Sequence, residues 1–110
     1  MGNCRSRYDH DMLLIVGTFS IPPENLSSAR PIMERMIRNS RAEDGCQEYS
    51  YAEDLLIPGL IHVKELWVDQ SALDRHFASG HLSEWRSSWA EFGIGDRNLR
   101  VYGVDAARET

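Results

Sequence analysis

Long apolar runs are absent from this chain. The longest uninterrupted one, Met12–Val16, is far shorter than the roughly 20 apolar residues that a membrane-spanning helix needs. The residues before it are polar and lack the apolar core of a secretory signal. We therefore expect no membrane contact.

Cysteine and lysine are scarce as well. The two cysteines, Cys4 and Cys46, lack the close spacing of a zinc or redox motif. This usage predicts a reduced, cytoplasmic protein. Lys64 is the single lysine beside eleven arginines, an imbalance that we attribute to GC-rich coding and that hints at a bacterial source. The net charge of −5 argues against nucleic-acid binding, which depends on clustered basic side chains.

The composition is that of one globular domain. With 110 residues, of which 42% are hydrophobic and 26% charged, the chain is large enough to bury one core and too small for two. We expect a flexible leader over residues 1–11, a domain over 12–105 and a frayed tail over 106–110. Met1–Ser6 matches an N-myristoylation pattern, which we attribute to chance or to an untidy start of the sequence.

Hydrophobic periodicity predicts four strands and two helical regions. Strands are expected where apolar residues run or alternate, over 13–21, 46–55, 60–68 and 98–104. An amphipathic helix is expected over 24–44, with Pro31 bending or loosening its first turns. The second helical region starts at 69–71, is interrupted at Ser79-Gly80 and continues over 81–92.

The order βαββαβ predicts a ferredoxin-like α+β fold, in which helices cover one face of a four-stranded antiparallel sheet. The short turn at Ile57–Gly59 makes the two middle strands an antiparallel hairpin. The other face of the sheet is left open. Because the strands are apolar, we expect a homodimer that packs sheet on sheet.

Four passages of the chain resemble the antibiotic biosynthesis monooxygenase (ABM) family of dimeric α+β barrel proteins. They are Ser40–Cys46, Tyr49–Tyr51, Glu65–Trp67 and Ala72–His81, and the resemblance extends over residues 13–104. It implies a homodimer with a pocket between sheet and helices in each subunit. It implies one of two functions: a cofactor-free oxygenase that uses O₂ on phenols or quinols, or a non-catalytic ligand-binding or stress-associated protein.

The cofactor-free reaction needs little from the protein. Deprotonating an electron-rich hydroquinone gives an anion that can itself pass an electron to oxygen, so the site has to hold the ring, accept the proton and stabilise charge. Haem degradation, known elsewhere in the superfamily, is less favoured. That branch uses an Asn in the first strand, which is absent here, and a late helical His, at whose position this chain has Trp85 or Arg86.

Three residues are candidates for the proton chemistry. His76 and His81 flank the helix interruption, and a neutral imidazole suits a general base. The alternatives are a packed helix-face His76 and a capping or surface His81. No third candidate metal ligand lies at the sequence spacing typical of a metal-binding motif, so we expect no metal site. Glu65, on the inner face of a central strand, either forms an ion pair with an Arg or His or acts as a base.

Five residues are candidates for binding an aromatic substrate. Trp67 ends its strand where a pocket wall is expected, with core packing as the alternative. Tyr49 and Tyr51 share a strand face, and a hydroxyl there can orient a quinone oxygen, although strand tyrosines are commonly core or interface residues. Trp85 belongs to an apolar helix stripe of the kind that usually packs a core. Arg86 can balance an anionic intermediate or lie in solvent.

Overall fold

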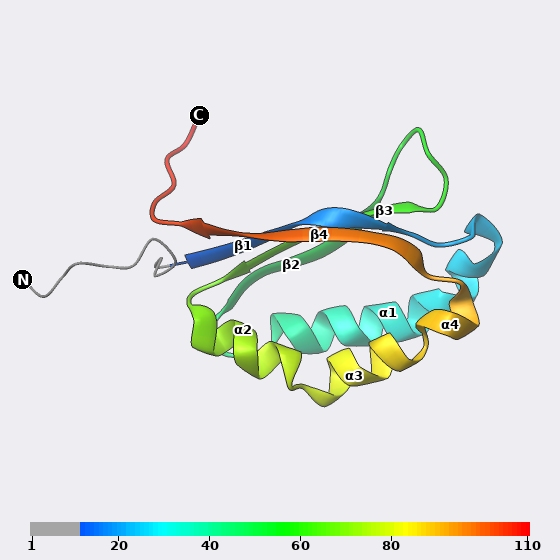
Figure 1. Cartoon of the computed structure of the whole chain (residues 1–110), viewed down its shortest axis with the longest axis horizontal. Helices are drawn as coiled ribbons and strands as arrows, with labels where there is room; N and C mark the ends of the chain where they lie inside the picture. The colour runs from blue at the N-terminus through cyan, green and yellow to red at the C-terminus, as the bar shows by residue number, and fades with distance from the viewer. Residues whose placement is uncertain (1–11) are drawn as a thin grey trace, which may run out of the picture.

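A computed structural model describes residues 12–110 of the chain, so the expectations for the leader, the myristoylation pattern and Cys4 lie outside the described residues. One sheet with helices on a single face makes up the domain (Figure 1). The sheet contains β1 (Met12–Ser20), β2 (Cys46–Glu53), β3 (Leu60–Trp67) and β4 (Gly95–Val104). Their order across the sheet is β2-β3-β1-β4, and every neighbouring pair is antiparallel. The predicted ferredoxin-like α+β fold is confirmed.

The helical layer contains a long helix and three short ones. The 3₁₀ turn η1 (Pro23–Asn25) leads into α1 (Leu26–Arg41), and the second helical region comprises α2 (Gln70–Phe77), α3 (Gly80–Ser87) and α4 (Trp89–Phe92). Helix α1 runs through Pro31 as a single helix, and the irregular geometry lies before it, in η1. The break between α2 and α3 falls where the sequence predicts it: the Ser79 side chain accepts a hydrogen bond from Leu82 N and so caps α3.

Alternation along the strands decides which face is buried. In β3, the buried residues are Ile61, Val63, Glu65 and Trp67, whereas His62 and Lys64 are exposed. This is the period-2 pattern of a strand with one face against helices. The core is formed by this inner face together with the apolar stripe of α1 and by Leu73, Leu82 and Trp85 from the short helices.

The structure differs from the predicted boundaries mainly at β4. This strand begins at Gly95 instead of Asn98, because Ser20 of β1 pairs with Gly95 beyond an irregularity in the β1–β4 register. The longer strand brings Arg97 into the sheet. No helix in the described part of the chain is long and apolar enough to cross a membrane. Residues 105–110 form neither helix nor strand.

No helix of residues 12–110 covers the outer face of the sheet (Figure 1). Leu14, Leu66 and Tyr102 lie in register on it, as Leu14 pairs with both of the others. The β2–β3 loop rises on the same side and bears Leu55, Leu56 and Ile57, of which Leu55 is fully exposed. This side of the molecule therefore presents apolar residues on both the sheet and the loop.

Candidate active site

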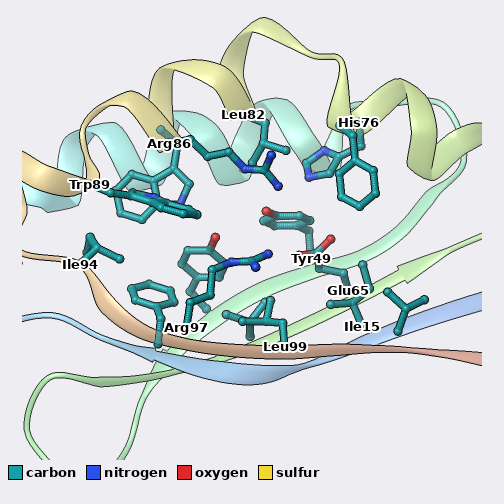
Figure 2. Close-up of a pocket in the computed structure, with 16 residues that line it drawn as sticks. Ile15, Tyr49, Glu65, His76, Leu82, Arg86, Trp89, Ile94, Arg97 and Leu99 are labelled. Carbon is teal, nitrogen blue, oxygen red and sulfur yellow. The ribbon is translucent and has the colours of Figure 1, made fainter.

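A cavity of about 210 Å³ lies between the inner face of the sheet and the short helices (Figure 2). Residues of all four strands and of α2, α3 and α4 line it: Ile15, Phe19, Tyr49, Tyr51, Val63, Glu65, His76, Phe77, Leu82, Trp85, Arg86, Trp89, Ile94, Arg97, Leu99 and Val101. Phe77 and Val101 are about half exposed, so they mark the side where the cavity meets solvent. The wall is aromatic and aliphatic with a few polar groups, the usual composition of a small-molecule site.

A hydrogen-bonded cluster of one carboxylate and two histidines stands beside the cavity. Oε2 of Glu43 lies 2.7 Å from Nδ1 of His76 and 2.7 Å from Nε2 of His81. A carboxylate only accepts hydrogen bonds, so each of these ring nitrogens carries the N–H. In neutral His76 this tautomer leaves Nε2 with a free lone pair. Because Glu43 lies outside the cavity wall and His76 is part of it, the Nε2 edge is the one available to a bound molecule.

Local backbone geometry holds Glu43 against the helix that bears His76. Glu43 lies in the turn between α1 and β2, and Gly45 in the same turn has φ of +89°. A Cβ on Gly45 would stand 2.6 Å from the Ala72 Cβ of α2, so only glycine permits this approach. Asp69 caps α2 by accepting a hydrogen bond from Ala72 N at 2.8 Å. The turn and the helix therefore pack directly together.

His76 is almost fully buried, with 1% of its surface exposed. Its ring centroid lies 4.6 Å from that of Trp67 and 5.3 Å from that of Tyr49. Burial lowers the pKa of His76 below its usual value, while the hydrogen bond and the charge of Glu43 act in the opposite direction. The net result favours a neutral imidazole at physiological pH, the form that can accept a proton.

Glu65 is a buried carboxyl on the cavity wall, and it has no ion pair with any residue in 12–110. Its Oε1 accepts a hydrogen bond from the Trp67 indole N–H at 3.0 Å, so the expected ion pair with Arg or His is replaced by a neutral donor. Burial raises the pKa of Glu65 to about 7, although this hydrogen bond and the charges of Arg97 and Arg86 lower it. Glu65 can therefore give or take a proton near neutral pH.

Tyr49 and Tyr51 project from β2 into the cavity and stack with ring centroids 5.8 Å apart. Burial is the main factor that raises the pKa of both hydroxyls, that of Tyr51 to about 12. Both therefore stay protonated and can donate a hydrogen bond to a bound oxygen atom. Tyr49 is further fixed by its backbone oxygen, which accepts from Nε of Arg41 at 2.7 Å.

Arg86 of α3 and Arg97 of β4 bring positive charge to the cavity. Figure 2 shows their guanidinium groups extending from opposite walls into the same space beside Tyr49. The Trp89 ring lies near both, 6.0 Å from the Arg86 Cζ and 5.7 Å from the Arg97 Cζ. The indole Nε1 of Trp89 is itself buried without a hydrogen-bond partner in the described part of the chain.

Six of the eight residues predicted from the sequence line the cavity: His76, Glu65, Tyr49, Tyr51, Trp85 and Arg86. The other two, Trp67 and His81, are not part of the lining. Trp67 is fully buried beneath His76 and donates to Glu65, so it supports the wall instead of stacking on a ligand. His81 contacts Glu43 and is not part of the lining. Sequence reasoning missed Glu43 and Arg97.

Glu43, His76 and His81 also offer a cation three ligand atoms that lie within 4.8 Å of one another. Glu43 is thus the third possible metal ligand, which the spacing of residues in the sequence did not reveal. The N···O separations of 2.7 Å are those of hydrogen bonds, whereas ligands around a tetrahedral zinc stand roughly 3.3 Å apart at the usual Zn–N distances. The present arrangement is a hydrogen-bond network.

The fold and the cavity together define a ferredoxin-like α+β protein with a small-molecule site between sheet and helices. Residues 12–88 match the family model "Antibiotic biosynthesis monooxygenase" (ABM), and the chain belongs to this family. A Mycobacterium tuberculosis protein named "Putative monooxygenase Rv0793" is 31% identical over 77 residues, which cover 70% of this chain and 75% of that protein.

Two further proteins are similar to this chain. An uncharacterized protein of Synechocystis is 23% identical over 94 residues, which are 86% of this chain and 64% of that protein, so the match covers less than two thirds of that relative. The crystal structure of a "putative antibiotic biosynthesis monooxygenase" from Deinococcus radiodurans superposes with a TM-score of 0.82 at 24% identity, covering 89% of this chain and 97% of that one. At this identity the superposition shows the fold.

Proposed function

We propose that this protein is a cofactor-independent monooxygenase that oxidises a phenolic or quinol-type aromatic molecule with O₂. The observation that carries the proposal is His76, a buried imidazole on the wall of an aromatic cavity, with Nδ1 fixed by Glu43 and Nε2 left free. A general base needs both this geometry and a neutral ring. The family assignment adds support, since one relative carries the name "Putative monooxygenase".

The proposed reaction begins with proton transfer from the substrate hydroxyl to Nε2 of His76. The resulting anion is held by the hydroxyls of Tyr49 and Tyr51 and by the charges of Arg86 and Arg97. It gives one electron to O₂, and the two radicals combine to form a C–O bond and a hydroperoxide. Loss of water from a hydroquinone hydroperoxide leaves a hydroxyquinone, so one oxygen atom enters the ring and the other leaves as water.

Trp67 and Glu65 support this chemistry from the deep side of the cavity. Trp67 packs against the His76 ring and donates to Glu65, so it positions both titratable groups. The proton held by His76 goes to the peroxide anion to give the hydroperoxide. Glu65, with a pKa of about 7, is suited to protonate the oxygen that leaves as water and to take up the proton that the ring then loses. His81 shares the Glu43 carboxylate with His76 and so helps to position it.

Oxygen uptake by the purified protein tests the proposal. Protein loaded anaerobically with each of a panel of quinols is exposed to ¹⁸O₂, and we expect uptake above the buffer rate with one ¹⁸O atom in the product. A His76→Gln variant should lose this rate, and the surface variant His62→Gln should keep it. Binding of quinols without any oxygen uptake would instead identify a non-catalytic ligand-binding protein.

We further propose that two chains pair through the outer face of the sheet. Leu14, Leu66 and Tyr102 lie in register on that face, and the exposed loop bearing Leu55 rises beside it. An apolar surface of this kind is stabilised when a second copy covers it. Light scattering should therefore give twice the chain mass for the wild type and the monomer mass for Leu66→Glu. A monomeric wild type would contradict the pairing.

A further inference from the structure

Two arginines on the cavity wall have no acceptor for their N–H groups among the described residues, 12–110. Within residues 12–110, neither Arg86 nor Arg97 has an ion pair or a hydrogen bond, although both are part of the cavity lining. Other arginines of the helical layer and the adjoining turn have such partners: Arg30, Arg35 and Arg38 pair with glutamates, and Arg41 and Arg75 donate to backbone oxygens. Arg86 and Arg97 therefore have N–H groups at the cavity that a ligand can use.

Aromatic contacts position the two guanidinium groups without occupying their donors. The Arg86 Cζ lies 5.8 Å from the Phe77 ring centroid and 6.0 Å from that of Trp89, and the Arg97 Cζ lies 5.7 Å from Trp89. A cation over a ring is attracted to its face, while the N–H groups in the guanidinium plane stay free. Two like charges beside one indole repel each other, and an anion placed between them removes this repulsion.

The protein as a whole is acidic, with a net charge of −5, so a positively charged cavity is a local feature. The carboxyl group of Glu65 is the acidic group in the cavity lining. Because its pKa is raised to about 7, it is partly protonated near neutral pH and compensates the two arginines incompletely. The cavity therefore has excess positive charge to offer a ligand.

The two ends of the cavity differ in chemistry. Figure 2 shows His76 and Glu65 toward one end, Trp89 and Ile94 toward the other, and the two guanidinium groups between the walls. We propose that the cavity binds an aromatic acid, a phenol or quinol whose carboxylate is held by Arg86 and Arg97 while its hydroxyl faces His76. This deepens the proposed function and rests on it.

A carboxylate fits this arrangement better than a phenolate oxygen alone. Arginine pairs with a carboxylate through two parallel N–H···O bonds, and two arginines together can use both oxygens of one carboxylate. The volume of about 210 Å³ lies below the roughly 300–1,000 Å³ of sites for drug-sized ligands. A single substituted ring is therefore the appropriate size.

Anaerobic calorimetry with a matched pair of ligands tests this inference. At pH 7.5 the acid is 2,5-dihydroxybenzoate and the uncharged isostere is 2,5-dihydroxybenzamide, so both have the same ring hydroxyls. We expect the acid to bind at least about tenfold more tightly, equivalent to about 1.4 kcal/mol. The preference should shrink as salt is added, because both arginines are near solvent.

Arginine variants identify the groups responsible. Arg97→Gln and Arg86→Gln should each reduce the preference for the acid to about threefold or less. Arg38→Gln is the matched control, since the Arg38 side chain lies on α1, is 77% exposed and is not part of the cavity lining, and it should keep the wild-type preference. Circular dichroism checks that all three variants are folded.

Equal affinity for acid and amide would overturn the inference, and so would a loss in Arg38→Gln as large as that in Arg97→Gln. Its failure is separable from that of the proposed function. Oxygen uptake with uncharged quinols but no preference for the acid contradicts the inference alone. A tenfold preference without any oxygen uptake supports the inference for binding and contradicts the monooxygenase.

Discussion

Two histidine–carboxylate pairs in this molecule have almost the same length and very different surroundings. His76 lies 2.7 Å from Glu43, and His62 lies 2.8 Å from Asp54. The side chains of the first pair are 2% and 15% exposed, whereas those of the second are 52% and 24% exposed. The first pair borders the cavity, and the second joins β3 to the β2–β3 loop. The contact distance alone therefore does not distinguish the two pairs, whereas burial and access to a cavity do.

Exchanging each histidine for glutamine should produce the largest contrast between the pairs. His76→Gln removes the proposed base, and we expect kcat/KM for quinol oxidation to fall by about 10²- to 10⁴-fold. His62→Gln should leave kcat/KM unchanged because His62 is exposed and is not part of the cavity lining. Steady-state oxygen uptake measures both. Comparable rates in the two variants would show that the buried His76 and the exposed His62 do not differ in their contribution to turnover.

A third carboxyl, Glu65, sharpens the comparison because it is buried without a histidine. Its pKa is about 7 in the folded protein against 4.5 ordinarily, so the folded state binds more protons than the unfolded state between these values. Wild-type stability therefore falls as pH rises through this window. Glu65→Gln lacks this effect, and since one pKa unit is worth about 1.4 kcal/mol, it should be more stable than wild type at pH 8 by up to about 3 kcal/mol.

Urea denaturation at pH 4.5 and pH 8 measures this difference. The gain should be small at pH 4.5, where the wild-type carboxyl is protonated in the folded protein. A Glu65→Gln variant that is less stable than the wild type at pH 8 would show that the charged carboxylate has a stabilising partner in solution.

Exchanging the carboxylates should have a smaller effect on turnover than exchanging the histidines. Glu43→Gln weakens the group that orients His76, and we expect kcat/KM to fall by about 10- to 100-fold. Glu43 also raises the pKa of His76, so the acidic limb of the pH–rate profile should move to lower pH in this variant. If the maximal rate falls but the acidic limb of the pH–rate profile stays at the same pH, Glu43 has only a structural role.

Asp54→Asn should have the smallest effect of the set. The hydrogen bond from His62, followed by those from the Leu56 and Ile57 backbones, holds the pKa of Asp54 below its usual value. The stabilisation from this carboxylate is therefore present above the ordinary carboxyl range and is lost as pH falls through the lowered pKa. Because the pair is near solvent, thermal melting at pH 7 should show a slight decrease and turnover should not change. A loss of turnover would connect the loop to the cavity.

Local patterns in the sequence predicted most of the fold. Alternation in β3 identified Ile61, Val63, Glu65 and Trp67 as the inner face, and the helix break at Ser79-Gly80 was visible as a change in periodicity. The start of β4 was not visible in the sequence, because Asp96 there adopts φ of +50° and the register with β1 is irregular. Placing the strand start at Asn98 excluded Arg97 from the sheet and hence from the predicted site.

The candidate site depended more on contacts between distant parts of the chain. Glu43 lies 33 residues before His76, and its approach requires Gly45 to pack against α2, which periodicity does not encode. Trp67 was assigned to the correct face of its strand. Its exclusion from the cavity follows from tertiary packing, since the rings of Tyr49 and His76 both lie against it.

The positions of the tryptophans make the intrinsic fluorescence of this protein sensitive to the contents of the cavity. All three tryptophans, Trp67, Trp85 and Trp89, either line the cavity or pack against His76 on its wall. A ligand that enters the cavity changes the polarity and quenching around most of the emitting groups at once. Intrinsic fluorescence can thus screen a chemical library against the unlabelled chain, and quinones, as efficient quenchers, would report product occupancy in the same experiment.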